Sequence, residues 1–312
     1  MFSWIKQILF PAKPHQTSAP VPMSAPVSAP KPAPKNEITP EMRRAADAAL
    51  KQASGDMHAT LLPAVIFTMD GTDAPDVLLG SRLGGRPALP QNDTLPMDAS
   101  GKPMALLIQL NFAEMPHLSG YPEVGLLQVF IQMNDLFGQA FEPDEAPGFA
   151  LRYDPDPQGF VLAPPVFGPS DTLPPGPPFD MVPFDWADWH TTGKQITFST
   201  NDLPPSMTDY RIAKIIDAHW RALDHTKTDA LNDWAFDAHA PGHGNLGGYA
   251  RYTQEDPRND PNNAKYDTCL LSLGLADNVI MWGDCGEMSL HISAKDLAAR
   301  RFDDVLYYWD CC

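Results

Sequence analysis

The side chains in this chain that are best suited to bind a ligand occur in a pattern that the chain contains twice. The segment GGRPALPQND supplies Gln91 and Asp93, and the segment GGYARYTQED supplies Gln254 and Asp256. These amides and carboxylates could bind a ligand, but such side chains also satisfy backbone groups in turns. Repetition favours the structural interpretation, because a recurring unit needs the same corner each time, whereas an active site is seldom needed twice.

Two segments have spacings that metal ions use. His239 and His243 are four residues apart, as in helical metal sites, but Pro241 and Gly242 lie between them and exclude a helix. The acidic segment DGTDAPD at 70–76 lacks the remaining ligands of a calcium loop and is interpreted as a turn. We therefore expect no metal site and no cofactor.

The segment WGDCG contains Trp282, Asp284 and Cys285 and raises the question of a nucleophilic thiol. A thiolate needs a nearby base, and His291 would lie about 20 Å away along an extended strand. We therefore expect a tight turn with a structural Asp284. With no export signal in view, free thiols are expected, although a Cys269–Cys285 bridge is geometrically open. The sequence contains no GxSxG, HExxH, Walker or dinucleotide motif.

The matching segments extend beyond the glutamine and aspartate. Each copy opens on a glycine pair and continues into an apolar run, then a glycine and a strand-like segment. The ranges 84–131 and 247–292 are therefore predicted to be a duplicated unit, with glycines supplying turns at positive φ. The glycines of the two pairs lie 163 positions apart and are Gly84, Gly85, Gly247 and Gly248.

Periodicity predicts short strands with a few helices. Because these elements do not alternate regularly as βαβ units, we expect an α+β fold with a mostly antiparallel sheet, two related halves and a few peripheral helices. A helix is predicted from Pro40 to Gly55, and residues 147–185 are expected to be rich in loops. The remaining strands are predicted over 60–69, 105–112, 125–133, 195–200 and 305–310, and the remaining helices over 206–223, 228–238 and 293–300.

The distribution of proline divides the chain into two parts. Nine of the 34 prolines lie within residues 11–40, in an Ala/Pro/Ser-rich tract that cannot build a core. Residues 1–36 are therefore expected to be a disordered tail and tether, and residues 37–312 a single domain. Residues 1–10 are too short to span a bilayer, although they could act as an interfacial anchor.

The charge of the chain restricts its partners. The net charge is −17, and residues 41–312 carry 18 basic and 38 acidic side chains. Such a body repels the phosphates of nucleic acids and favours encounter with a basic protein. Solubility is the simpler explanation of the same charge.

Several segments resemble the YwqG-like family of bacterial proteins of unknown function. These segments cover about residues 78–312 and include SRLGGRPALP, GGYARYTQEDPR, IMWGDCGEMSLHIS and FDDVLYYWDCC. The resemblance implies a cytoplasmic bacterial α+β protein with two related halves and supplies no catalytic residues. It also implies a link to contact-dependent toxin genes, near which members of the family are found.

The leading hypothesis is therefore a non-enzymatic acidic protein-binding module, immunity-like or accessory to a toxin system. The alternative is a hydrolase or small-ligand-binding enzyme in which acids such as Asp256, Asp284 and Asp310 converge from separate segments. The candidate ligand- or partner-binding residues are Gln91, Asp93, Gln254, Asp256, Trp282, Asp284 and Asp310.

Overall fold

The computed structural model describes residues 40–134, 136–140, 147–165, 192–212, 214–215, 233–235, 237, 242–276 and 279–312. Residues Pro40–Cys312 form one compact unit. The predicted tether at 1–36, the possible anchor at 1–10 and His239 lie outside the described residues, as do 216–223 and 228–232 of the two predicted helices.

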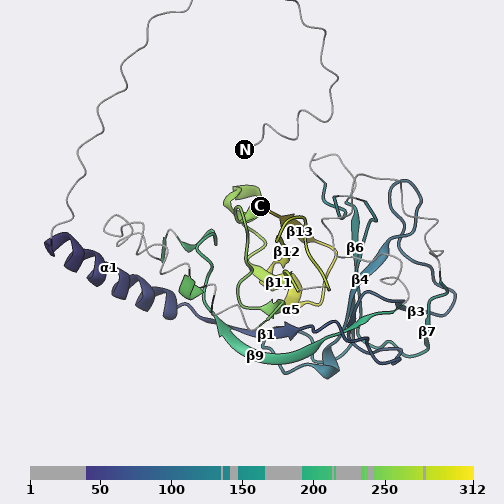
Figure 1. Cartoon of the computed structure of the whole chain (residues 1–312). Helices are drawn as coiled ribbons and strands as arrows, with labels where there is room; N and C mark the ends of the chain where they lie inside the picture. Colours follow the sequence, from purple (N-terminus) through teal and green to yellow (C-terminus); the bar gives the residue numbers. More distant parts are fainter. Residues whose placement is uncertain are drawn as a thin grey trace, which may run out of the picture. The chain divides into compact units, whose positions relative to one another are not determined.

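The first sheet has six strands in the order β13-β12-β11-β10-β1-β9, and its strands pair antiparallel (Figure 1). The predicted strands over 60–69 and 305–310 are found here as the second strand from one edge and as the opposite edge strand. The bounds are β1 (Leu62–Thr68), β9 (Thr197–Leu203), β10 (Gly244–Gly247), β11 (Thr268–Leu273), β12 (Glu287–Ile292) and β13 (Val305–Asp310).

The second sheet has five antiparallel strands in the order β6-β5-β4-β2-β8, and a small two-stranded sheet pairs β3 with β7. Residues 147–185 are expected to be rich in loops, but the described part of this range contains the strands β6 and β7. The bounds are β2 (Arg82–Leu83), β3 (Ala88–Pro90), β4 (Ala105–Asn111), β5 (Leu126–Ile131), β6 (Phe149–Asp154), β7 (Phe160–Leu162) and β8 (Lys194–Gln195).

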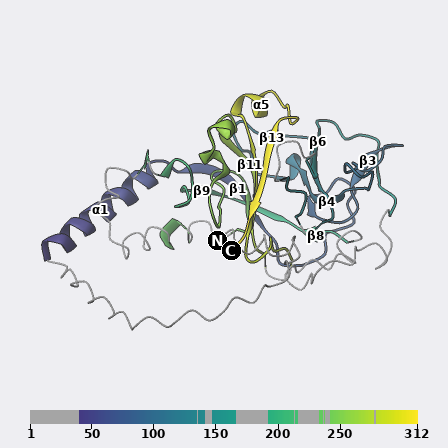
Figure 2. The same ribbon diagram turned by 90° about the horizontal axis from the view of Figure 1, so that it is seen from above.

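The main core contains side chains from both sheets. Alternate residues of β12, such as Leu290, and of β5, such as Val129, enter this core and are fully buried. Each such side chain contributes about 1.5–3 kcal/mol through burial. The edge strands β6 and β13 lie beside each other in both views (Figures 1 and 2), and the rings of Phe149 and Tyr307 stack with centroids 4.9 Å apart.

Helices are few. The helix α1 (Pro40–His58) continues past Gly55, where it was predicted to end, because Met57 is fully buried against a cluster that includes Ala235. The short α5 (Ala294–Ala298) begins after Ser293, whose side chain accepts from the Asp296 N–H, as the sequence predicts. No helix in the described ranges is long and apolar enough to cross a membrane. The fold is therefore α+β and dominated by antiparallel sheet.

Four strands of each large sheet pair in the same order, although β3, which pairs with β7, has no equivalent among the described residues between β10 and β11. In the first sheet the order β10-β11-β12-β13 matches the order β2-β4-β5-β6 of the second. The hairpin β4–β5 has an irregularity between Leu106 and Ile108, and β11–β12 has one between Cys269 and Leu271. These irregularities lie 163 positions apart, the same spacing as the glycine pairs. The two sets of four strands therefore share their order, and the hairpins β4–β5 and β11–β12 share register and bulge position.

Candidate functional site

Both glycine pairs are sharp turns at the end of a strand. All four glycines have positive φ, with values of 65° at Gly84, 77° at Gly85, 68° at Gly247 and 60° at Gly248. A Cβ at Gly248 would lie 2.9 Å from the Ala64 Cβ, so the turn also needs a residue without a side chain. Each turn places the segment that follows it against the sheet whose strand ends at that turn.

After the second turn, residues 249–258 cover a polar face of the first sheet, where Asp256 and Arg258 form a buried ion pair. Asp256 caps the short 3-10 helix η4 (Pro257–Asn259) by accepting from the Arg258 N–H. Its Oδ1 also accepts from Arg258 Nε at 2.9 Å, and its Oδ2 accepts from Nη2 at 2.7 Å. Burial by itself lowers the pKa of the Arg258 guanidinium, but the bidentate pair with Asp256 outweighs it, so the pKa is raised and the group stays charged.

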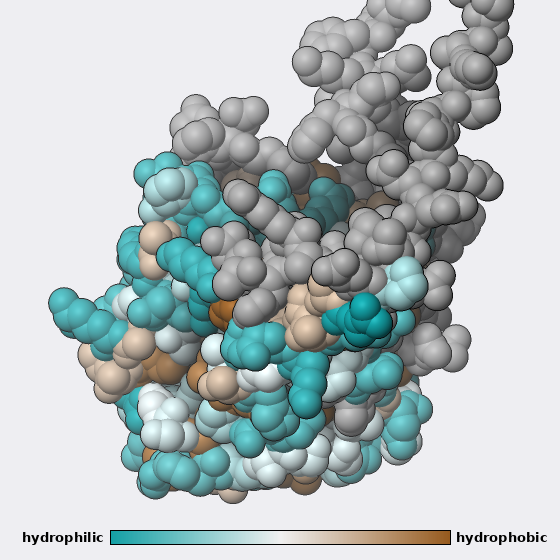
Figure 3. Space-filling view, turned by 90° about the vertical axis from the view of Figure 1, so that its left-hand side faces the viewer, coloured by the Kyte–Doolittle hydropathy of each residue, from teal (hydrophilic) through white to brown (hydrophobic). Residues whose placement is uncertain are grey.

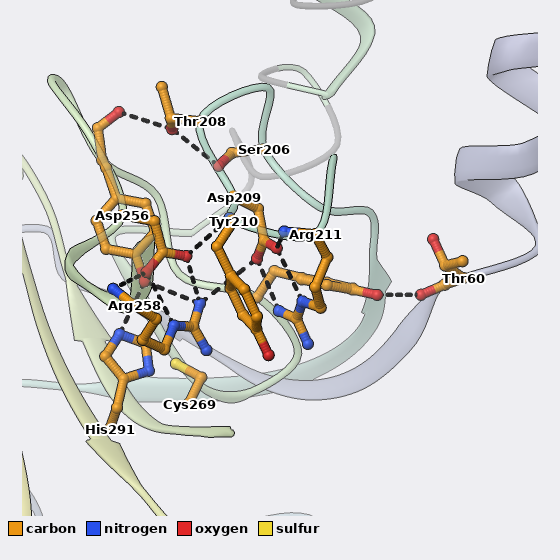
Figure 4. A network of polar contacts seen from close by, with 12 residues as sticks. Thr60, Ser206, Thr208, Asp209, Tyr210, Arg211, Asp256, Arg258, Cys269 and His291 are labelled. Atoms are coloured by element: carbon orange, nitrogen blue, oxygen red, sulfur yellow. Dashed lines mark hydrogen bonds and ion pairs between the residues drawn. The ribbon is translucent and has the colours of Figure 1, made fainter. Parts of the chain in front are cut away.

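A second carboxylate, Asp209, extends the pair into a network (Figure 4). Asp209 accepts from Arg211 Nε at 2.8 Å and Nη2 at 2.7 Å, and it lies 3.5 Å from Arg258 Nη2. The Tyr210 N–H donates to Asp256 Oδ2 at 3.1 Å. The guanidinium groups of Arg258 and Arg211 lie 4.7 and 5.0 Å from the centre of the Tyr210 ring. The loop at 206–211 is thereby bound to the 249–258 segment.

The network reaches the sheet through Tyr252 and His291. Arg258 Nη2 donates to the Tyr252 hydroxyl at 3.0 Å, and this hydroxyl shares a hydrogen bond with His291 Nε2, 2.8 Å away. Burial and the neighbouring arginines lower the pKa of His291 well below its usual value, so the imidazole is neutral.

The sequence raised Cys285 as a possible nucleophile, but the cysteine opposite His291 in the sheet is Cys269. Burial raises the pKa of the Cys269 thiol to about 12. A neutral thiol beside a neutral imidazole is a poor nucleophile. Cys269 is a free thiol, as expected, so the bridge to Cys285 that the sequence left open does not form. A cross-strand Cys–His pair could not be found from sequence spacing, because the two residues are 22 positions apart.

The arrangement is suited to holding segments together. The Arg258 side chain is only 1% exposed. Its Nη1 and the Nδ1 of His291 have no hydrogen-bond partner among the described residues. Tyr249, also buried, donates from its hydroxyl to the Thr60 carbonyl before β1. The network therefore binds the 206–211 loop and the 249–258 segment to the sheet.

Comparison with known families places this site within one domain. Residues 81–311 match a family described as a domain of unknown function, DUF1963. The chain belongs to the DUF1963 family. No curated protein matches it. The buried network lies inside the DUF1963 domain, except for its contact with Thr60.

Other predicted residues of the second half bind backbone groups of the DUF1963 domain. Asp310 is buried and accepts from the Thr253 N–H at 3.0 Å and the Gln254 N–H at 2.8 Å. Gln254 Nε2 donates to the Cys311 carbonyl at 2.6 Å. Trp282 is fully buried in the main core. Asp284 is exposed, and its carbonyl accepts from the Cys312 N–H.

The first half does not repeat this network. Gln91 is exposed, and Asp93 binds Arg152 Nη1 at 2.9 Å near the surface. Asp93 and Asp256 therefore occupy the same place in the sequence pattern but have different partners and burial.

No group of three or more metal-binding side chains occurs in the part of the chain that the structure describes. His243 accepts from the Met69 N–H through Nδ1 at 2.9 Å. In the acidic segment 70–76, Asp70 accepts from the Thr72 N–H and Gly71 has positive φ, which is the geometry of a turn.

Proposed function

We propose that this DUF1963 protein is a non-enzymatic, acidic protein-binding module that masks a basic partner. The observation that carries the proposal is that the positively and negatively charged side chains differ in their partners and exposure. Most of the described arginines bond to carboxylates or backbone carbonyls of the fold, whereas many carboxylates face solvent and make no internal ion pair.

Arg82, Arg152 and Arg300 illustrate the first half of this observation. Arg82 is buried, and its guanidinium donates to four backbone carbonyl oxygens of residues 77–86. Arg152 pairs with Asp93, and Arg300 donates to the carbonyl oxygens of residues 120 and 121. Their positive charge therefore serves the fold and is less available to a ligand.

The carboxylates are arranged differently. Exposed acidic residues that pair with no cation among the described residues include Asp70, Asp76, Asp156, Asp202, Glu255, Asp260, Asp267, Asp284 and Asp303. The face drawn in Figure 3 is mostly hydrophilic where residues are described, and its hydrophobic residues form separate small areas. A surface of this kind attracts a basic protein over several ångströms and raises the rate of encounter.

Two further parts of the proposal rest on a resemblance in sequence and on the strand pairing. Resemblance to the YwqG-like family supports an immunity-like or accessory role in a bacterial toxin system, with the protein in the cytoplasm. The shared strand order, register and bulge position support an origin of the two halves by duplication of the units at 84–131 and 247–292.

The alternative is a hydrolase that uses Asp256, Asp284 and Asp310, and the environments of these residues weigh against that set. Asp256 and Asp310 are buried and bonded to backbone and arginine groups, whereas Asp284 is exposed. A shared catalytic site would need carboxylates that face one solvent-filled space.

The test is to capture the partner and measure how salt affects its association. The immobilised full chain is incubated with lysate of its own host, bound proteins are identified by mass spectrometry, and the purified partner is then studied by surface plasmon resonance. Exposed charges are largely screened near physiological ionic strength, so the association rate should fall at least tenfold between about 0.05 and 0.5 M salt. The dissociation rate should change less.

The result that overturns the proposal is an association rate that does not depend on salt, or a bound molecule that is a neutral metabolite. Either result would favour the small-ligand alternative. An uncharged analyte measured at each salt concentration is the control for effects of salt on the instrument.

A further inference from the structure

Two adjoining depressions lie beside the edge of the first sheet. One, of about 400 Å³, is lined by nine of the residues from Phe112 to Glu123 together with Val65 and Leu246. The other, of about 320 Å³, is lined by residues of β1 and by 200–202 of the edge strand β9. They share His117 and Leu118, so they form one extended surface, which we name the 112–123 groove.

The groove has an apolar floor. Val65, Leu118, Tyr121 and Leu246 line it and belong to the main core. Leu62 and Val124 are the sequence neighbours of the groove residues Pro63 and Glu123. Both are exposed, Leu62 at 37% and Val124 at 57%. Exposed apolar side chains beside an apolar depression are typical of a surface that binds another protein.

Carboxylates surround this floor. The Glu123 side chain is 73% exposed and lines the first depression, with His117 Nδ1 3.4 Å away. Asp202 is exposed, lines the second depression and pairs with no cation among the residues described. Arg300 donates from its two Nη atoms to the carbonyls of residues 120 and 121, so the negative charge of the rim comes, among the described lining residues, from Glu123 and Asp202 alone.

The wall of the groove is held in place by contacts with both sides of the sheet. The Tyr121 hydroxyl donates to the Cys269 carbonyl, and Arg300 donates to the Tyr121 carbonyl at 2.8 Å. Gly247 lies beneath Leu118, where a Cβ would come within 2.8 Å of the leucine Cδ2. A wall that is fixed before binding lowers the entropic cost of association.

We propose that the 112–123 groove binds an extended segment of a basic protein that alternates apolar side chains with lysine or arginine. Alternate side chains of an extended chain lie about 7 Å apart and point the same way. Apolar side chains would enter the two depressions on either side of Leu118. The lysines or arginines between them point away from the floor, and their long stems would bend back to bring the cations to Glu123 and Asp202 at the rim. This inference rests on the proposed function and assigns it a place and a partner chemistry.

The test uses a fluorescein-labelled peptide, Gly-Lys-Val-Lys-Leu-Lys-Val-Lys-Gly, and the purified full chain. Fluorescence anisotropy measures its dissociation constant for the unmodified protein and for Glu123→Lys and Asp202→Lys. Reversing one charge should weaken binding about tenfold, because an attraction typical of an exposed pair becomes a repulsion. Asp156→Lys and Asp284→Lys change the net charge equally at exposed positions outside the groove, so they should stay within twofold.

A second readout locates the peptide directly. A benzophenone amino acid at Val124, beside the groove, should cross-link to the peptide, whereas the same group at Val161 on β7 should not. Circular dichroism and the melting temperature check that each variant is folded. A peptide with serine in place of valine and leucine should bind at least tenfold more weakly, because the floor of the groove is apolar.

The outcomes separate the two proposals. If the cationic peptide binds but the control variants weaken it as much as Glu123→Lys and Asp202→Lys, the groove is wrong and the acidic binding module stands. If a peptide with glutamate in place of lysine binds equally well, both proposals fail. Cross-linking at Val161 but not at Val124 also overturns the groove.

Discussion

Glu287 makes a pH-dependent contribution to stability that can be worked out from its surroundings. It begins β12, opposite Asp310 on β13, and its Oε1 lies 2.9 Å from Arg251 Nη2. Its Oε2 has no hydrogen-bond partner among the described residues. Burial raises the pKa of Glu287 to about 7, with Asp310 adding to the rise and Arg251 opposing it.

The sign follows from proton binding. With an ordinary pKa of 4.5 in the unfolded chain and about 7 in the folded protein, the folded state binds more protons between these values. The contribution of Glu287 to the free energy of unfolding is therefore fully present below about pH 4.5 and is lost as the pH rises through 7. At 1.36 kcal/mol per pKa unit, the loss is about 3 kcal/mol.

The assay compares the unmodified protein with Glu287→Gln, which keeps the shape of the side chain and cannot ionise. Urea denaturation at intervals from pH 4.5 to 8.5 measures the free energy of unfolding of both proteins. Subtracting the variant cancels the other titrating groups, and the loss of a partner for Arg251 adds a constant because that guanidinium stays charged. The difference, unmodified protein minus variant, should fall by about 3 kcal/mol across this range.

The matched control is Glu123→Gln, whose side chain is 73% exposed. The corresponding difference for that variant should change by less than about 1 kcal/mol over the same range. If the Glu287 difference is constant with pH or rises with it, the carboxyl is not desolvated as the structure indicates, and the reasoning fails.

Three further predictions concern the network, the turns and the tether. Arg258→Met leaves the Asp256 carboxylate buried without its cation and should destabilise the protein by about 3–5 kcal/mol in urea denaturation; a loss under about 1 kcal/mol would contradict a buried pair. Gly248→Ala should cost at least about 1 kcal/mol more than Gly101→Ala, because both have positive φ but only the first Cβ meets neighbours within 4 Å; equal losses would argue against tight packing at the turn. Deleting residues 1–36 should leave the melting temperature within a few degrees, because their composition buries little apolar surface, and a fall of about ten degrees would contradict this.

Local patterns predicted the elements whose causes are local. The strand β13 has the predicted bounds Val305–Asp310, and α5 begins after the predicted cap Ser293. Strand alternation and helix capping act between residues a few positions apart, so they are legible in one segment. The strand β6 was missed because it is defined by pairing with β5, and α1 passed Gly55 because a distant cluster buries Met57.

The candidate site shows the other side of this division. The sequence alone was sufficient to pair Asp93 with Asp256 in one repeated pattern, and to predict glycine turns before each. Only the tertiary structure decided that Asp256 is buried with Arg258 while Asp93 meets Arg152 at the surface. Burial and charge partners depend on which segments the sheets bring together, and the partner Asp209 lies 49 positions from Arg258. The same local sequence can therefore dictate a turn twice and yet leave the electrostatics of its side chains to the rest of the fold.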